Sequence, residues 1–260
     1  MKLGIDILGN VAILKFDRNV KVREKKKIAL QFLKEHKGVS TILEKTGGFK
    51  GRLRKQTTKF LAGDRTKEAL YKENGCEFRL NVDTCYFSPR LSSDRKEIAE
   101  KVKKGEDVLV MFGGVAPYPI VIAKLSKAKK IVSVEINREC SKYAQINVKR
   151  NKLNNVEIVQ GDVRRAIGKG KKINEKFSRI MMARPNLKDD FLDVAFSVSK
   201  KGTIVHYHGF YLEDNLDELK ELIVNRAKKA GKKIKILKIK KAGDIGAYRF
   251  RYRVDFKVMN

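Results

Sequence analysis

The hydrophobic positions between residues 107 and 162 fall into five short groups. Apolar runs at 108–110, 130–134 and 156–160 have the length of buried strands, and the segments 120–125 and 140–151 fit helices. Strands that alternate with helices at this spacing need crossover connections, which keep the strands parallel and the connections right-handed. The pattern therefore predicts a parallel sheet in the middle of the chain.

The same alternation continues toward the C-terminus. Further strands are predicted at 177–182 and 203–208, and helices at 94–103, 189–199 and 216–230. The alternating runs 234–240 and 248–258 are expected to pair as an antiparallel hairpin at one edge. A Rossmann-like α/β sheet of seven mostly parallel strands, with the last pair reversed, is typical of class I S-adenosylmethionine-dependent methyltransferases.

The N-terminal part of the chain has a different pattern. Residues 3–16 alternate around Gly9 and Asn10, which predicts a hairpin. Residues 21–36 place apolar positions among lysines at the spacing of a basic amphipathic helix. We therefore expect a small basic α+β domain at residues 1–84, which contacts RNA, and a catalytic α/β domain at residues 85–260.

Small and acidic residues stand where the predicted parallel strands end. Gly113 and Gly114 have no Cβ, so the backbone after the first strand can approach a ligand closely. Glu135 follows about 20 residues later, where nucleoside-binding sheets bring a carboxylate to ribose hydroxyls. Asp162 ends the third strand and would accept a hydrogen bond from an adenine amino group. Ordinary tight turns and solvated acids remain the alternatives.

The glycine turn lacks the last glycine of the G-x-G-x-x-G pattern, because Ala116 and Pro117 stand there. In dinucleotide enzymes that pattern seats a pyrophosphate on the helix N-terminus. The turn therefore favours a ligand without a diphosphate, such as S-adenosylmethionine. An NAD-type oxidoreductase is disfavoured.

The charge of the chain indicates a partner. Among 260 residues, 60 Lys and Arg stand against 30 Asp and Glu, which gives a formal net charge of +30. A surface of this kind attracts polyanions and makes their binding salt-dependent. We therefore expect contact with RNA or DNA, with a merely lysine-rich, solvated surface as the plainer alternative.

The cysteines and the apolar runs bear on location. Cys76, Cys85 and Cys140 lack the spacing of a metal site, and an odd number is poor material for disulfides. No apolar run approaches the roughly 20 residues that span a bilayer. We expect a cytoplasmic protein in a reducing compartment, without a membrane segment or a metal. His206 and His208 alternate on an apolar strand, and packing explains them better than metal binding does.

Six motifs together resemble one family. They are ALYKENGC at 69–76, VDTCYFSPRLSSDR at 82–95, MFGGVAPY at 111–118, VEIN at 134–137, QGDVR at 160–164 and IVHYH at 204–208. In combination they resemble the archaeal and eukaryotic tRNA (guanine-37-N1)-methyltransferases and their sibling, the wybutosine-pathway aminocarboxypropyl transferase. The resemblance implies methyl transfer from S-adenosylmethionine to N1 of guanosine 37, next to the anticodon. We expect the tRNA anticodon stem-loop as the partner, and a monomer.

The resemblance also implies roles for single residues. Arg54 falls at the family's catalytic arginine, which neutralises the charge that develops on guanine O6 once N1 loses its proton. Phosphate binding is the alternative for this side chain. Asp94 stands where the family has a glutamate proposed as general base, although it would serve equally as a helix cap. Pro185 is expected to shape the wall of the catalytic pocket.

The remaining family positions divide between cofactor and RNA. The expected cofactor-binding residues are Tyr86, Arg90, Met111, Phe112, Gly113, Val115, Glu135, Ile136, Asp162 and Val163. The expected RNA-binding residues are Arg52, Arg54, Arg95 and Arg184, and lysines at 21–26, 50 and 228–233 would hold phosphates.

Three positions depart from the family's pattern. Val110 replaces an acid at the end of the first strand, Ala183 replaces an asparagine that helps to orient guanine, and Asp94 replaces the glutamate. These departures keep three alternatives open: aminocarboxypropyl transfer, a bifunctional wybutosine-pathway methyltransferase, and a tRNA-binding protein with a relict pocket. Methyl transfer to guanosine 37 is the function that the motifs together favour.

Overall fold

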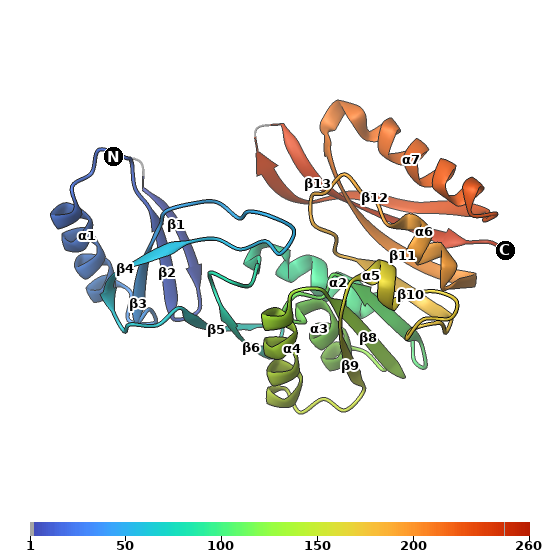
Figure 1. The fold of residues 1–260 in the computed structure, drawn as a ribbon, viewed down its shortest axis with the longest axis horizontal. Coiled ribbons are helices and arrows are strands. Elements are labelled where there is room, and N and C mark those ends of the chain that lie inside the picture. Colours follow the sequence, from blue (N-terminus) through green and yellow to red (C-terminus); the bar gives the residue numbers. More distant parts are fainter. Residues whose placement is uncertain (1–2, 247) are drawn as a thin grey trace.

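The computed structural model describes residues 3–246 and 248–260, which form a small N-terminal sheet and a larger sheet flanked by helices (Figure 1). The N-terminal sheet has the order β1-β2-β3-β4. Its elements are β1 (Gly4–Leu8), β2 (Val11–Lys15), α1 (Val22–Glu35), β3 (Thr41–Lys45) and β4 (Thr58–Gly63). The predicted hairpin and basic helix are confirmed. Helix α1 buries Ala29 and Phe32 against Leu14 and Ile42 in a small separate core.

A two-stranded hairpin, β5 (Glu68–Glu73) and β6 (Cys76–Asn81), lies between the two sheets. Two asparagines, one in α4 (Arg138–Arg150) and one at its C-cap, accept hydrogen bonds from backbone N–H groups of this hairpin. Asn147 accepts a hydrogen bond from Arg79 N at 2.7 Å, and Asn151 accepts one from Glu77 N at 2.9 Å. The hairpin thus packs onto the larger unit, and the division after residue 84 stays a prediction.

The larger sheet contains seven strands in the order β12-β13-β11-β10-β7-β8-β9. Their bounds are β7 (Asp107–Met111), β8 (Lys130–Glu135), β9 (Val156–Gln160), β10 (Phe177–Met182), β11 (Ser199–Leu212), β12 (Ile234–Gly246) and β13 (Arg249–Val258). The predicted seven-stranded α/β sheet is confirmed. The expected antiparallel pairing of the last two strands at one edge is confirmed, but only one of the two strands is reversed. Strand β13 runs antiparallel to both β11 and β12, so β12 points the same way as the parallel strands.

Helices cover both faces of this sheet, as the alternation of buried residues along its strands requires. Val108 and Val110 pack with one core cluster, while Leu109 and Met111 pack with the other. The first face carries α2 (Ser92–Lys101), α3 (Pro117–Leu125) and α4 (Arg138–Arg150), and the second carries α5 (Val163–Ala166), α6 (Leu192–Ser197) and α7 (Leu216–Lys229). Short 3-10 helices span Pro89–Leu91 and Glu213–Asn215.

Two predicted boundaries differ in ways that have local causes. The helix expected at 189–199 is shortened to α6. Phe191 at its N-cap has a φ of +59°, and Asp189 and Asp190 accept hydrogen bonds from Phe191 N and Leu192 N at 3.0 Å in the turn before it. Helix α5 was not predicted. It has four residues, too few to show a period.

Candidate active site

A cavity of about 350 Å³ opens at the carboxyl ends of β7, β8 and β10. Open α/β sheets bind ligands at this edge. Segments that end these strands form the floor: Phe112–Gly114, Glu135–Ile136 and Ala183–Asn186. The remaining walls come from the N-terminal loop at 52–54, the segment 86–95, and strands β11 and β13. One cavity thus joins parts of the chain that are far apart in the sequence.

The turn after β7 depends on both of its glycines. A Cβ on Gly113 would lie 2.0 Å from the Ser133 hydroxyl of β8, so a larger residue there would force the Ser133 side chain to move. Gly114 has a φ of +58°, in the left-handed region that glycine adopts without strain. Phe112 and Ala116 share this region, with φ values of +64° and +68°. The surrounding packing holds this strained turn open toward the cavity.

Glu135 ends β8 and faces the turn. Its two carboxylate oxygens accept hydrogen bonds from Gly114 N and Asn137 N, both at 2.7 Å. Burial raises the pKa of Glu135, and these backbone donors offset only part of that effect. Each oxygen keeps a lone pair that could accept a ribose hydroxyl, which is the role expected for this residue.

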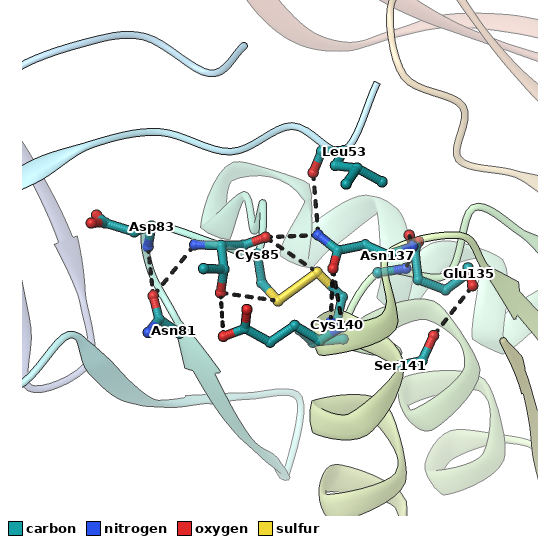
Figure 2. Close-up of a disulfide and its surroundings, with 12 residues drawn as sticks. Leu53, Asn81, Asp83, Cys85, Glu135, Asn137, Cys140 and Ser141 are labelled. Atoms are coloured by element: carbon teal, nitrogen blue, oxygen red, sulfur yellow. Dashed lines mark hydrogen bonds between the residues drawn. A yellow bond between two sulfur atoms is a disulfide. The ribbon is translucent and has the colours of Figure 1, made fainter. Parts of the chain in front are cut away.

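A disulfide joins the segment before Tyr86 to the start of α4. Cys85 and Cys140 are bonded, with their Cα atoms 5.5 Å apart, while Cys76 is buried and free. Figure 2 shows the bond next to Asn137 and Glu135, with Leu53 on the side of the N-terminal loop. The expectation that the cysteines form no disulfide is therefore wrong. A sequence separation of 55 residues carries no signal that two side chains will meet.

Asn137 connects three segments beside this disulfide. It caps α4 by accepting a hydrogen bond from Glu139 N at 3.1 Å. Its amide donates to Thr84 O at 2.8 Å and to Leu53 O at 3.3 Å (Figure 2). One side chain therefore ties the N-terminal loop, the segment before Tyr86 and the end of β8 together.

Asp162 lies in a smaller hollow that shares a wall with the main cavity. The hollow is lined by Arg52, Phe112, Val134, Ile136, Gly161, Asp162, Val163, Pro185, Leu187 and Phe191. Asp162 caps α5 by accepting from Arg164 N at 2.7 Å, and it pairs with Arg52. Burial acts to raise the pKa of Asp162, but the Arg164 backbone donor and the Arg52 charge outweigh it and lower the pKa. An adenine amino group would share this carboxylate with Arg52.

Arg54 and Tyr86 meet on the cavity wall. The Arg54 guanidinium lies over the Tyr86 ring at 4.8 Å from its centroid and over the Phe49 ring at 5.6 Å. The backbone of Arg54 has a φ of +53°, in the turn that brings the loop back toward Tyr86. Both residues line the cavity, so the structure brings the expected catalytic arginine to the site.

Asp94 does not line the cavity, and neither expected role fits its position. It is 4% exposed and pairs with Arg253 at 2.5 Å. Tyr118 and His208 donate to its other oxygen, at 2.7 and 3.2 Å. Burial acts to raise the pKa of Asp94, but His208 and Arg253 outweigh it and hold the pKa well below its usual range. A carboxylate in this environment is a weak base, and it caps no backbone N–H of α2.

The expected RNA-binding arginines lie in different environments. Arg95 is 1% exposed, pairs with the Glu73 carboxylate and lines the cavity, so its contact with RNA stays a prediction. Arg184 is 6% exposed and donates to Leu187 O and Asp189 O at 2.5 and 2.7 Å. It lines the cavity from a buried position, and its contact with RNA stays a prediction. Arg52 is partly exposed at the cavity edge but pairs with Asp162.

Three expected cofactor-binding residues lie outside both the cavity and the smaller hollow. Arg90 pairs with Asp6 at 3.3 Å and lines a separate hollow against the N-terminal sheet. Met111 and Val115 are fully buried, in opposite core clusters. The motif that contains them is at the site, but their side chains pack inward. Tyr86, Phe112, Gly113, Glu135, Ile136 and Pro185 do line the cavity, and Val163 lines the smaller hollow.

The cavity also contains residues that the sequence did not identify. Tyr118, His208, Phe210, Arg249 and Arg251 line it. The two arginines belong to the alternating run RFRYRVDF of β13, in which positions two apart share a face of the strand. Arginine at every second position of an otherwise apolar strand is the sequence signal that could have indicated these two residues.

His206 is buried beside the second of two carboxylates. Its Nδ1 lies 2.6 Å from Asp255 Oδ1 and its Nε2 lies 2.7 Å from Arg179 Nη1. Since arginine only donates, Nε2 must accept and the ring is neutral. Among residues 3–246 and 248–260, no group of three His, Cys, Asp or Glu side chains could hold a metal ion.

A comparison with protein families matches residues 69–239 to the TRM5/TYW2 methyltransferase domain. The tRNA (guanine(37)-N(1))-methyltransferase Trm5b of Pyrococcus abyssi is 33% identical over 260 residues, which covers 98% of this chain and 74% of that protein. The tRNA (guanine(37)-N(1))/4-demethylwyosine(37)-methyltransferase Taw22 of Nanoarchaeum equitans is 32% identical, over 97% of this chain and 99% of that protein.

Solved structures of similar proteins have the same fold. The crystal structure of Pyrococcus abyssi Trm5b superimposes with a TM-score of 0.87 at 32% identity, over 99% of this chain and 75% of that one. The complex structure of aTrm5 and tRNALeu superimposes with a TM-score of 0.84 at 26% identity, over 100% of this chain and 72% of that one. In the part of the chain described here, no helix is long and apolar enough to cross a membrane.

Proposed function

The chain belongs to the TRM5/TYW2 methyltransferase family, and from that premise we propose that it methylates N1 of guanosine 37 in tRNA. S-adenosylmethionine is the cofactor of this fold and family. The proposal is carried by one observation: Arg54, from the N-terminal loop, and Glu135, at the end of β8, line the same cavity. The cation proposed to contact the base and the carboxylate proposed to bind the ribose then face the same cavity.

The cofactor half of the cavity is the part around β7 and β8. Glu135 would accept hydrogen bonds from the ribose hydroxyls, and the glycine turn leaves room for the chain that carries the sulfonium. Phe112 and Ile136 line both hollows and would flank the adenine, with Asp162 at its edge. When bound, S-adenosylmethionine supplies an electrophilic methyl carbon.

Arg54 and Pro185 belong to the guanosine half of the cavity. Loss of the N1 proton leaves negative charge that guanine shares between N1 and O6. The Arg54 guanidinium, held over the Tyr86 ring, would stabilise that charge at O6. Pro185 would limit how far the base can enter, so that N1 is aligned for in-line attack. The target base must leave its stack to reach this depth.

His208 takes over the proton-accepting role that Asp94 cannot fill. It lines the cavity, and its Nε2 donates to the ionised Asp94 at 3.2 Å, which leaves Nδ1 as an acceptor. Burial lowers the pKa of His208, although Asp94 acts in the opposite direction, so the ring is neutral at pH 7. In this proposal His208 accepts the N1 proton and Asp94 orients its ring.

A His208→Gln variant tests this role. We expect kcat to fall by roughly 10²- to 10⁴-fold, the range typical of a lost general base. The acidic limb of the pH–rate profile should disappear as well. His206→Gln is the matched control, since His206 is equally buried but does not line the cavity. An unchanged pH profile in His208→Gln would exclude it as the base.

The tRNA partner is supported by charge and by the solved complex of aTrm5 with tRNALeu. Lys21, Arg23, Lys26 and Lys50 are exposed on the N-terminal unit, as are Lys228, Lys229 and Lys233 at the end of α7. They would hold phosphates of the anticodon stem-loop. We propose a cytoplasmic monomer, although the disulfide removes the cysteines as an argument for a reducing compartment.

A second candidate activity is methylation of 4-demethylwyosine at the same position. The observation that favours it is the match to Nanoarchaeum equitans Taw22, whose name contains both activities and which aligns over 99% of its length. The sibling reaction, aminocarboxypropyl transfer, would use the same cofactor but cleave a different bond to sulfur.

Labelled cofactor separates these activities. The protein is incubated with methyl-labelled or carboxyl-labelled S-adenosylmethionine and tRNA transcripts that carry G or A at position 37. Methyl label on the G37 transcript alone supports the proposal. Methyl label on tRNA that contains 4-demethylwyosine adds the second activity, and carboxyl label in tRNA indicates aminocarboxypropyl transfer. If calorimetry detects no cofactor binding, only the interpretation as an RNA-binding protein remains.

A further inference from the structure

Arg251 on β13 is a buried arginine that forms no ion pair with an acidic side chain of the described residues. The residue is 8% exposed, and within residues 3–246 and 248–260 its Nε has no hydrogen-bond partner. Arg253, two positions further along the strand, pairs with Asp94, Glu97 and Asp255. No Asp or Glu of the described residues pairs with Arg251 in this way. The guanidinium forms a side-chain hydrogen bond with Tyr86, but its buried Nε has no acceptor, which is costly unless something else supplies one.

The surroundings of Arg251 direct it into the cavity. Its guanidinium lies 5.1 Å from the centroid of the Phe210 ring, and that of Arg184 lies 5.9 Å from the same ring. All three side chains line the cavity. Burial acts to raise the pKa of Tyr86, but the charges of Arg251 and Arg54 outweigh it and lower the pKa. Arg251 therefore acts on the same part of the cavity as Arg54.

Strand order assigns this part of the cavity to the target base. From β8, which holds Glu135, the sheet continues through β7, β10 and β11 to β13. Neighbouring strands are about 4.8 Å apart, so Arg251 belongs to a strand roughly 19 Å from the ribose carboxylate. The glycine turn, where the sulfonium would lie, is only one strand from Glu135. The acceptor that Arg251 lacks should therefore come from the nucleotide rather than from the cofactor.

We infer that Arg251 recognises the O6 and N7 atoms of the target guanine and thereby sets the specificity for guanosine. This inference rests on the proposed function. A guanidinium matches these two adjacent acceptors with two parallel hydrogen bonds. Contact at this edge leaves N1 free for the methyl group. Adenine presents an amino donor in place of O6, so it would meet the guanidinium donor to donor.

This contact also accounts for the alanine in the loop after β10. Ala183 stands where the family pattern has an asparagine that orients guanine, and its side chain cannot form a hydrogen bond. Arg251 approaches the same part of the cavity from β13 instead. Arg184, anchored by its bonds to Leu187 O and Asp189 O, closes the wall between them.

The test removes one hydrogen-bond acceptor, N7, from the target base. Wild type and Arg251→Lys are compared on transcripts with guanosine or 7-deazaguanosine at position 37, which differ only in the N7 acceptor. For wild type we expect kcat/KM to fall roughly 10- to 100-fold on the 7-deaza transcript, the range of a good bidentate contact. Arg251→Lys should lose a similar factor on guanosine and then respond less than about 3-fold to the 7-deaza change. Lys257→Met, an exposed position on the same strand, should behave like wild type.

The same four combinations are also measured as equilibrium binding with S-adenosylhomocysteine, so that the contact is tested independently of methyl transfer. No transfer to any transcript together with the expected coupling in binding would reject the proposed function and keep the contact. Full sensitivity of Arg251→Lys to N7 would overturn the inference. Weaker cofactor binding without a change in N7 sensitivity would also overturn it, and would assign Arg251 to the cofactor carboxylate. An equal loss on both transcripts with a reduced salt dependence would assign it to a phosphate.

Discussion

At the scale of single residues, Glu135 shows how the backbone prepares a side chain for its ligand. Two N–H groups, one from the glycine turn and one from Asn137, hold the carboxylate before any ligand arrives. Its conformation needs little further ordering on binding, which reduces the entropic cost of association. Burial raises its pKa, so the carboxylate takes up a proton at a higher pH than an exposed glutamate does.

Replacing Glu135 tests the ribose assignment. In Glu135→Gln we expect the Kd for S-adenosylmethionine to rise roughly 10- to 100-fold, because two hydrogen bonds to a charged acceptor are weakened. Calorimetry measures this directly. Glu139→Gln is the matched control, since Glu139, in the first turn of α4, accepts a hydrogen bond from Thr84 and does not line the cavity. Equal affinity in both variants would remove Glu135 from the cofactor site.

Arg54 is predicted to act on the transition state more than on tRNA binding. Arg54→Lys keeps the charge but loses the planar group that lies over Tyr86. We expect kcat to fall by about 10²-fold or more, as when a donor to a developing oxyanion is removed. Single-turnover kinetics and filter binding separate the two effects. A loss of tRNA affinity with unchanged kcat would make Arg54 a phosphate contact.

At the scale of elements, the loop between β3 and β4 assembles the site from a distance. It has few contacts of its own and is held by contacts at its tip: Arg52 to Asp162 and Leu53 O to Asn137. The segment before Tyr86 is held in the same place by the Cys85–Cys140 disulfide. The positions of Arg54 and Tyr86 therefore depend on elements of the larger sheet.

The disulfide should contribute measurably to stability. Closing a loop of 55 residues stabilises the folded state by about 4 kcal/mol in the chain-entropy model. Cys85→Ser should therefore lower Tm by on the order of 10 °C, read by calorimetry without reductant. Thiol titration in denaturant is the control: wild type should show one reactive thiol, from Cys76. Three reactive thiols would mean that the bond is absent.

At the scale of the whole molecule, a buried network of charges joins β10, β11, β13 and α2. Arg253 is fully buried among Asp94, Glu97 and Asp255, and Arg179 pairs with Glu106 and His206. Removing Arg253 would take away the charge that Asp94 and Asp255 share in the interior. The network also connects the cavity wall at His208 to the antiparallel edge of the sheet.

This network makes the stability of the protein dependent on pH. Burial lowers the pKa of His206 and His208, although their aspartates act in the opposite direction, so the unfolded chain binds protons that the folded chain does not. Stability is then lost as the pH falls below about 6.5, the usual pKa of histidine. Asp94 and Asp255, whose pKa values are lowered, add a second loss below about pH 4.

Thermal unfolding between pH 5 and pH 8 measures the histidine part. Wild type should lose Tm steadily on acidification, and His206→Gln should lose less over the same range because one of the two buried histidines is gone. His36→Gln, a change at the end of α1 and outside the network, should retain the full slope. A slope in His206→Gln equal to that of wild type would show that the buried ring does not control stability in this range.

Much of the fold follows from patterns that are local in the sequence. The apolar runs of β7, β8 and β9, the intervening helices and the hairpin around Gly9 depend on residues only a few positions apart, and all were predicted. Glu135 was found in the same way, because a strand end and a glycine turn at a set spacing define its place. The class of fold, the cofactor edge and the affinity for a polyanion were therefore determined by the sequence alone.

The tertiary structure decided which side chains meet. Arg52 contacts Asp162 across 110 residues, and Arg253 contacts Asp94 across 159. Asp94 was expected at the ligand, but its partners on β13, α3 and β11 hold it outside the cavity. Arg251 and the disulfide were missed for the same reason. A side chain's protonation and reach depend on neighbours that only the packing of distant elements provides, and no short stretch of sequence contains that information.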